Sequence, residues 1–294
     1  MGDRLHLAEV AGAGVDGVDR APARGALVEV RERVAYATLD RPERLNALSV
    51  GLTNDLVDAF DAFSTDPGIW AVLLTSTGER AFSAGADLKD MGQADARRAA
   101  AAGGGPAAVT AGRPGTVPMT GSRRNFFEVI LECAKPTVAA VFGWAMGGGC
   151  ELALACDVRI AADDLRIGMP ESKRGLGANF GSVVLPRVVP LGLAYQMLYT
   201  GEPLTAEDAH RWGLVQAVVP RPELAARAEE LVRSIVANAP LTNQRYKAMI
   251  TKGRDLPVAA ALRLNAGPNP YLSEDRKEGV AAFLERRTPN WEAR

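Results

Sequence analysis

The stretch Met146-Gly147-Gly148-Gly149-Cys150-Glu151, together with Pro170-Glu171 further along, decides the fold and the chemistry expected of this chain. A glycine run that opens a helix leaves backbone N–H groups free to face a bound anion or a carbonyl oxygen. Two carboxylates beside such donors are what proton transfer next to a carbonyl requires. Glycine-rich turns also begin many ordinary helices, whose dipole alone favours a first-turn Glu. The functional interpretation of this stretch therefore needs support from a second motif elsewhere in the chain.

That second match is another turn of small residues, within Ala81-Phe82-Ser83-Ala84-Gly85-Ala86-Asp87-Leu88-Lys89. It follows an apolar run at residues 69–75 that is bounded by Pro67-Gly68 and Gly78, and this run predicts a buried parallel strand. A small-residue turn leaving such a strand is another place where a backbone N–H can face a ligand.

Composition excludes several classes of function. The chain has 294 residues, enough for one domain with a sizeable core or for one domain plus a small appendage. A net charge of −1 and a pI near 6.2 provide no basic field for nucleic acid and no polybasic membrane patch. We expect no signal peptide and no membrane span, because no segment approaches ~20 apolar residues. Three isolated cysteines without metal-ligand spacing indicate reduced thiols and a cytoplasmic location: Cys133, Cys150 and Cys156.

The histidines and one glycine pattern exclude further sites. Only His6 and His210 are present, so we expect neither a Ser-His-Asp triad nor a metal site, and the carboxylates must carry any acid–base work. Residues 12–17 form a formal G-x-G-x-x-G, but Pro22 and Gly25 follow too soon for the helix that a dinucleotide fingerprint needs.

Alternating strand and helix patterns predict an α/β fold with a parallel sheet and crossover helices. Residues 1–24 lack a clear period and predict a mobile N-terminal extension. Residues 25–219 form the predicted core, and residues 93–122, rich in Ala, Gly and Pro, are a flexible insert or a lid over the substrate site. Residues 220–294 have helical periods. The expected strands are 26–30, 34–39, 69–75, 137–141, 158–162 and 215–219; the expected helices are 49–63, 124–133, 148–155, 181–185, 191–199, 205–212, 224–237, 241–252 and 275–286.

Four segments, in this order and spacing, resemble the enoyl-CoA hydratase/isomerase family, the crotonases. They are Arg41-Pro42-Glu43-Arg44-Leu45-Asn46-Ala47-Leu48, residues 81–89, residues 147–151 and Pro170-Glu171. The resemblance covers about residues 27–291. It implies the crotonase spiral of ββα units with a helical C-terminal trimerisation region, which composition and periodicity alone do not show.

The resemblance assigns the chemistry to four residues. The N–H groups of Ala86 and Gly148 would bind the thioester carbonyl oxygen, Glu151 would deprotonate a water, and Glu171 would give a proton to the α-carbon. The implied enzyme is an enoyl-CoA hydratase, which adds water across the α,β double bond of an acyl-CoA. No separate cofactor is expected, because coenzyme A is part of the substrate. Two glutamates favour hydration over double-bond isomerisation, for which family members usually use one.

The resemblance also implies contacts with coenzyme A, from turns near the site and from the last helix: Arg44, Leu45, Ala84, Lys89, Phe283 and Arg286. Arg and Lys on such turns are otherwise ordinary solvated charges. In the family, the positions of Phe283 and Arg286 reach the coenzyme of a neighbouring subunit. The alternative is a plain amphipathic helix with Val280, Phe283 and Leu284 as its apolar face.

One segment departs from the family pattern. After Glu171 the family commonly has Pro-Gly-x-Gly-Gly, whereas this chain has Gly175-Leu176-Gly177-Ala178-Asn179-Phe180-Gly181. Asn179 stands where a glycine normally leaves room for the water and the acyl chain, so it either bonds to substrate or caps the next helix. Asn179 and Phe180 at the substrate pocket favour a functionalised or cyclic acyl group. They also leave open other crotonase reactions, namely isomerisation, thioester hydrolysis or C–C cleavage.

Two expectations concern the protein as a whole. An alternative of another class is a non-catalytic acyl-CoA-binding oligomer, against which the presence of both glutamates argues. A homotrimer or a dimer of trimers is expected, since four apolar side chains after residue 219 would otherwise lie bare: Leu231, Val232, Ile235 and Val236.

Overall fold

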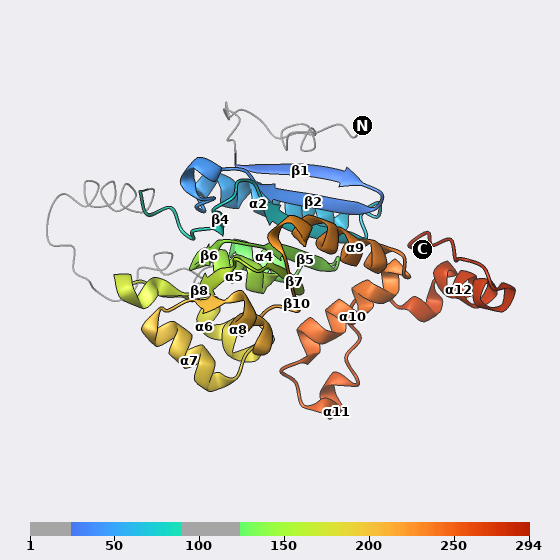
Figure 1. Cartoon of the computed structure of the whole chain (residues 1–294). Coiled ribbons are helices and arrows are strands. Elements are labelled where there is room, and N and C mark those ends of the chain that lie inside the picture. The colour runs from blue at the N-terminus through green and yellow to red at the C-terminus, as the bar shows by residue number, and fades with distance from the viewer. Residues whose placement is uncertain (1–24, 90–123) are drawn as a thin grey trace, which may run out of the picture.

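The computed structural model describes residues 25–89 and 124–294, which form two β-sheets with helices packed around them (Figure 1). The predicted N-terminal extension (1–24) and the predicted insert or lid (93–122) lie outside the described residues. Within the described part, every strand and helix expected from the sequence is present, with bounds that differ by a few residues.

The larger sheet has six strands in the order β1-β2-β3-β5-β7-β10. Its strands are β1 (Ala26–Arg31), β2 (Val34–Leu39), β3 (Ala71–Ser76), β5 (Thr137–Val141), β7 (Val158–Ala162) and β10 (Ala217–Val219). β1 and β2 form the predicted antiparallel hairpin, and the other neighbours are parallel. The central strands β3, β5 and β7 are buried along most of their length because helices cover both faces of the sheet.

The helices begin where the sequence supplies caps. Ser49 accepts a hydrogen bond from the Leu52 N–H at the start of α2, and Asn125 and Glu128 form a capping box on α4. The helices are α2 (Val50–Thr65), α4 (Phe126–Leu131), α5 (Gly148–Ala155), α6 (Gly181–Val184), α7 (Leu191–Thr200), α8 (Ala206–Arg211), α9 (Leu224–Val236), α10 (Pro240–Gly253), α11 (Val258–Ala261) and α12 (Glu274–Glu285). The described residues contain no helix with the length and apolarity that a membrane crossing requires.

A second, smaller sheet was not foreseen from the sequence. Its order is β4-β6-β8-β9, with strands β4 (Ala81–Ser83), β6 (Trp144–Met146), β8 (Arg166–Gly168) and β9 (Leu204–Thr205). Strands of two or three residues are too short to show a period of two, so the residue pattern does not predict them. This sheet matters most for function, because β4 and β6 are parallel neighbours and each leads into one of the two small-residue turns.

The expectation that α9 presents a bare apolar face is wrong. Val232 is fully buried, and Leu231, Ile235 and Val236 pack with it against the outer face of the larger sheet. Figure 1 shows α9 lying across that sheet. The Tyr36 hydroxyl on β2 bonds to the Glu229 carboxylate at 3.0 Å and ties the two layers together. The apolar residues of α9 therefore belong to the core of this chain and are no argument for assembly.

The apolar surface left uncovered lies further along the chain, on α10 to α12 and the segments between them. These elements extend away from the sheets (Figure 1). Their exposed side chains are Tyr246, Ile250, Leu256, Val258, Leu262, Tyr271, Leu272, Val280, Phe283 and Leu284. Exposed large apolar side chains on successive segments of a chain can form a subunit interface.

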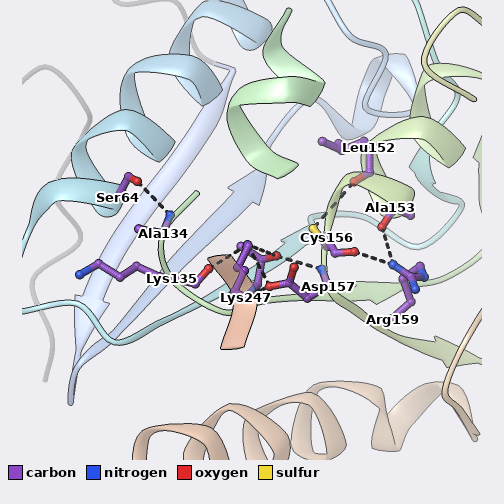
Figure 2. Close-up of polar contacts among 10 residues, drawn as sticks. Ser64, Ala134, Lys135, Leu152, Ala153, Cys156, Asp157, Arg159 and Lys247 are labelled. Carbon is purple, nitrogen blue, oxygen red and sulfur yellow. Dashed lines mark hydrogen bonds and ion pairs between the residues drawn. The ribbon is translucent and has the colours of Figure 1, made fainter. Parts of the chain in front are cut away.

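A buried lysine fixes α10 to the core. Lys247 Nζ lies 2.9 Å from the Asp157 carboxylate and donates to the Lys135 carbonyl oxygen at 3.0 Å (Figure 2). Asp157 in turn accepts from the Thr137 N–H at 2.7 Å, which places the pair between the starts of β5 and β7. Because the ammonium is almost fully buried, its partners must be present for the helix to dock.

We expect Lys247→Met to lower the free energy of unfolding by about 2 kcal/mol, because it removes a buried charged donor and leaves its acceptors unpaired. Urea unfolding followed by circular dichroism measures this loss. Lys252→Met, at an exposed position of the same helix, is the control and should change stability by less than about 0.5 kcal/mol. Equal unfolding midpoints for the two variants would show that the buried pair does not anchor α10.

Candidate active site

The two small-residue turns meet at the ends of β4 and β6. The chain leaves β4 through Gly85 and leaves β6 through Gly147 into α5. A Cβ on Gly85 would lie 2.6 Å from the Met146 carbonyl oxygen and 3.1 Å from the Gly148 nitrogen. Gly85 also has a φ of +89°, so both the close approach and the backbone conformation require glycine.

Two backbone N–H groups are presented at this junction. A Cβ on Gly148 would lie 3.6 Å from the Ala86 nitrogen, so the two donors, Ala86 N–H and Gly148 N–H, lie near each other. Leu48 pairs with both neighbours of Ala86, donating to the Gly85 carbonyl at 2.8 Å and accepting from the Asp87 N–H at 3.2 Å. Within residues 25–89 and 124–294, neither donor has a protein acceptor. This arrangement fits an oxyanion hole.

The turn is held by polar side chains whose structural role the sequence reasoning did not identify. Buried Asn46 donates through Nδ2 to the carbonyl oxygens of Thr77 (2.9 Å) and Ala81 (3.0 Å), and its Oδ1 accepts from the Arg41 N–H (2.9 Å). The Arg41 guanidinium lies 3.3 Å from the Asp87 carboxylate. A buried amide within the quoted 41–48 segment is the signal that could have indicated this role, because such a group needs partners.

Glu151 lies in the first turn of α5, and only 7% of it is exposed. Its Oε1 accepts a hydrogen bond of 2.8 Å from the Gly181 N–H at the start of α6. Burial, and to a lesser extent the charge of Glu171, raise the pKa of Glu151 to about 7, against the opposing effect of backbone N–H groups at 180 and 181. A carboxyl with this pKa exchanges protons readily near neutral pH.

Glu171 reaches the same turn from the 3₁₀ segment Pro170–Arg174 that follows β8. Its Oε1 lies 2.7 Å from where a Cβ on Gly147 would stand, and Gly147 has a φ of +56°. Its Oε2 is buried and has no hydrogen-bond partner among the described residues. Burial raises the pKa of Glu171. An unpartnered buried carboxyl oxygen is costly for a fold and is typical of a group that meets a ligand.

The four predicted catalytic positions are therefore brought together: Ala86, Gly148, Glu151 and Glu171. Donors for a developing oxyanion lie at the start of α5, and two carboxyl groups with raised pKa values lie beside the same turn. The arrangement can polarise a carbonyl and move protons at the adjacent carbons.

The residues predicted for coenzyme binding fall into two groups. Arg44, Ala84 and Lys89 are exposed on the turns beside the site, and half-buried Leu45 lines a cavity of about 280 Å³ with residues 77–81. Phe283 lies on α12 and Arg286 is the C-cap of that helix, which lies away from both sheets (Figure 1). The structure does not bring this second group to the site of its own chain.

The apolar face of the last helix is exposed in the described chain. Val280, Phe283 and Leu284 are 55%, 82% and 74% exposed, so no part of the described chain covers this apolar face. An exposed apolar face of this kind is typical of an interaction surface.

The structure also places Asn179 and Phe180, in the segment whose sequence departs from the family pattern. Asn179 is half-buried and does not cap α6, because the N-cap position is Phe180 and has no side-chain hydrogen bond. The ring of Phe180 is only 4% exposed and stacks on Phe127, with ring centroids 5.2 Å apart. Of these two residues, only Asn179 keeps a substantial part of its surface open.

Comparison with known proteins identifies relatives over almost the whole chain. The family model described as enoyl-CoA hydratase/isomerase matches residues 29–294. The crotonyl-CoA hydratase of Syntrophomonas wolfei is 34% identical over 271 residues, covering 90% of this chain and 96% of that protein. The (E)-benzylidenesuccinyl-CoA hydratase of Thauera aromatica is 37% identical over 268 residues, with 89% and 96% covered.

A solved structure agrees with these relatives. The enoyl-CoA hydratase of Bacillus anthracis superposes with a TM-score of 0.78 at 29% identity, covering 92% of this chain and all of that one. The fold predicted from the four segments is confirmed, including the helical region at the C-terminus. The chain belongs to the enoyl-CoA hydratase/isomerase family, and its fold and enzyme class are those of the crotonase-type hydratases.

Proposed function

We propose that this protein hydrates the α,β double bond of an acyl-CoA thioester through the backbone oxyanion hole and the two glutamates. The observation that carries the proposal is the meeting of both carboxyl groups at the Gly147–Gly148 turn, with Glu171 Oε2 buried and unpartnered within the described residues. Both hydratase relatives named above also support it.

In the proposed reaction the thioester oxygen accepts hydrogen bonds from the Ala86 and Gly148 N–H groups, which stabilise negative charge as it develops there. Glu151 takes a proton from a water whose oxygen forms a bond to the β-carbon. Glu171 delivers a proton to the α-carbon. One O–H bond of the water breaks, one C–O and one C–H bond form, and both glutamates exchange protons with solvent before the next turnover.

The same proposal places coenzyme A over the turns that carry Arg44, Leu45, Ala84 and Lys89. Arg44 and Lys89 are exposed cations that suit phosphate contact. Lys89 follows the oxyanion donor Ala86 by three residues, and Arg44 precedes Leu45, whose carbonyl oxygen accepts from the Ala84 N–H at 2.9 Å. The free, buried state of Cys133, Cys150 and Cys156 supports the proposed cytoplasmic location.

The simplest test of the reaction uses purified protein and a panel of enoyl-CoAs, linear, branched and polar, with loss of the conjugated absorbance as the signal. The proposal predicts rapid loss with at least one member. If free thiol appears in step with the loss of absorbance, thioester hydrolysis replaces hydration, and stable absorbance across the whole panel contradicts the proposal.

For the acyl group, we propose that Asn179 selects a polar or bulky chain, because a half-buried amide stands where the family commonly has glycine. The Thauera aromatica relative, a (E)-benzylidenesuccinyl-CoA hydratase, is consistent with such variation within the family. Asn179→Gly should raise kcat/KM for crotonyl-CoA relative to the preferred substrate, by about 10-fold if one hydrogen bond or one steric contact is involved. An unchanged ratio would show that the side chain faces away from the acyl group.

For assembly, we propose a homotrimer or a dimer of trimers in which α10 to α12 meet a neighbouring chain. The exposed apolar side chains on these elements support it, and so does the exposure of Phe283 and Arg286, which would complete the neighbour's coenzyme site. Light scattering at micromolar concentration should give three or six times the 31.1 kDa chain mass. Leu272→Asp, at a side chain 83% exposed in the single chain, should shift the mass toward one chain. A stable and fully active wild-type monomer would overturn this assembly.

A further inference from the structure

We infer that Phe180 is a positioning residue, whose ring, stacked on Phe127, holds the Gly181 N–H against the Glu151 carboxylate. The inference rests on the proposed role of Glu151. It replaces the expectation that Phe180 forms part of the substrate pocket, because the ring has its partner within the core.

The first step is the contact between the two rings. Phe180 and Phe127 are 4% and 6% exposed, and their rings lie 28° from parallel with centroids 5.2 Å apart. Phe127 belongs to α4, which is fixed at its start by the capping box of Asn125 and Glu128. The stack therefore ties Phe180 to a helix that has its own anchor.

The second step is the short path from this ring to the catalytic carboxylate. Gly181 directly follows Phe180, and its N–H donates to Glu151 Oε1 at 2.8 Å. On its other side, Gly181 lies against Met169, whose Sδ would be 2.3 Å from a Cβ at position 181. Position 181 is thus packed against Met169, with no room for a larger residue, and the neighbouring Phe180 carries the stacked ring.

The third step concerns the side chains that this turn buries. α6 has only four residues, and its N-cap makes no side-chain hydrogen bond. The preceding residues 172–177 are exposed. Within residues 172–184, Phe180 is the one large side chain that is buried, so we expect it to add much to the backbone hydrogen bonds that join Ser182 to Ala178 and Val184 to Phe180.

The expected effect of the stack is on the ionisation of Glu151. A donor aimed at the carboxylate favours its charged form and opposes the rise in pKa that burial causes. When the donor drifts away, the pKa should rise further and a larger share of the base should be protonated at neutral pH. The loss should appear in kcat and in the pH profile, with KM little changed.

The test compares Phe180→Ala, Phe180→Leu and Phe127→Leu with the wild type. The inference predicts that the acid limb of the kcat/KM profile moves upward by about one pH unit in Phe180→Ala and by less in the two leucine variants. Phe127→Leu and the double variant Phe127→Leu/Phe180→Leu should resemble Phe180→Leu, because all of them break the same stack. If Phe180→Ala fails to fold, the leucine variants carry the test.

The matched control is Phe63→Leu, which alters a ring of similar burial on α2, 5.5 Å from Phe60. It should lower the unfolding temperature as much as Phe180→Leu and leave the acid limb in place. An acid limb that stays fixed in every position-180 variant overturns the inference. A change confined to KM, different for each acyl group, also overturns it and makes Phe180 a direct substrate contact.

A measurement without substrate separates this inference from the proposed function. The Glu151 carboxyl carbon can be titrated by NMR in protein carrying ¹³C-labelled glutamate, with Glu151→Gln identifying its signal. A raised Glu151 pKa in Phe180→Leu supports the positioning role even if no enoyl-CoA is hydrated, in which case only the proposed function fails. An unaltered Glu151 pKa in active Phe180→Leu refutes the positioning role alone.

Discussion

Glu151→Gln should lower kcat by about 10²–10⁴-fold, with KM changed far less, because the carboxylate acts on the water in the transition state. The amide keeps the shape of the side chain and can still meet the Gly181 N–H through its oxygen, but it cannot accept the proton. In the wild type, activity should fall as pH drops below about 7, where Glu151 becomes protonated. Steady-state kinetics on the best substrate measure both effects.

The unfolding temperature of Glu151→Gln tests whether its loss of activity comes from a loss of folded structure. The pKa of Glu151 is raised from 4.5 to about 7, so folding binds a proton between these values. The stability associated with that proton is lost as pH rises through about 7. Glutamine carries no buried charge, so Glu151→Gln should unfold at pH 8 at the wild-type temperature or above it. Glu207→Gln, at an exposed side chain, is the activity control. Wild-type turnover in Glu151→Gln would remove this residue from the mechanism.

Glu171→Gln should also lower kcat by about 10²–10⁴-fold, but with a different signature. In the wild type, Glu171 takes and returns the proton at the α-carbon, so incubation of the 3-hydroxyacyl-CoA product in D₂O should exchange an α-hydrogen. In the variant this exchange should fall in parallel with kcat. ¹H NMR of the product measures the exchange directly.

The control for this second substitution is Glu202→Gln, whose exposed carboxylate pairs with Lys173 on the surface. It should keep normal turnover and exchange. Continued α-exchange in Glu171→Gln, with turnover lost, would assign the α-proton to another group. Exchange and turnover both at the wild-type level would mean that the buried, unpartnered Oε2 has no role in the reaction.

Some features of this fold could be predicted from the periodicity of the sequence, and others could not. The helix α2 was predictable because Ser49 caps it and its buried residues recur at helical spacing. The junction of the two turns was inferred only through the family resemblance, because β4 and β6 have three residues each and carry no period of their own. The pairing of these two strands is what brings Ala86 to Gly148.

There is a physical reason why the sequence could not predict what covers the apolar faces of α9 and α12. Apolar residues at helical spacing show that a face must be buried, but not whether the cover comes from the same chain. For α9 the cover is the outer face of the larger sheet, whereas α12 finds none within the described chain. Phe180 is a similar case, since an aromatic residue beside a catalytic segment can meet either substrate or core. Only the position of Phe127 distinguishes the two.

The most direct test of the central claim, that two carboxyl groups at one oxyanion hole divide the addition of water, is an isotope measurement on the product. The wild-type protein is incubated with its best enoyl-CoA in H₂¹⁸O, and separately in D₂O, and the product is analysed by mass spectrometry and NMR at early times. The account predicts an intact thioester with one ¹⁸O at the β-carbon and one deuterium at the α-carbon. Release of coenzyme A with ¹⁸O in a free acid, or deuterium uptake with a shifted double bond and no oxygen, would contradict it.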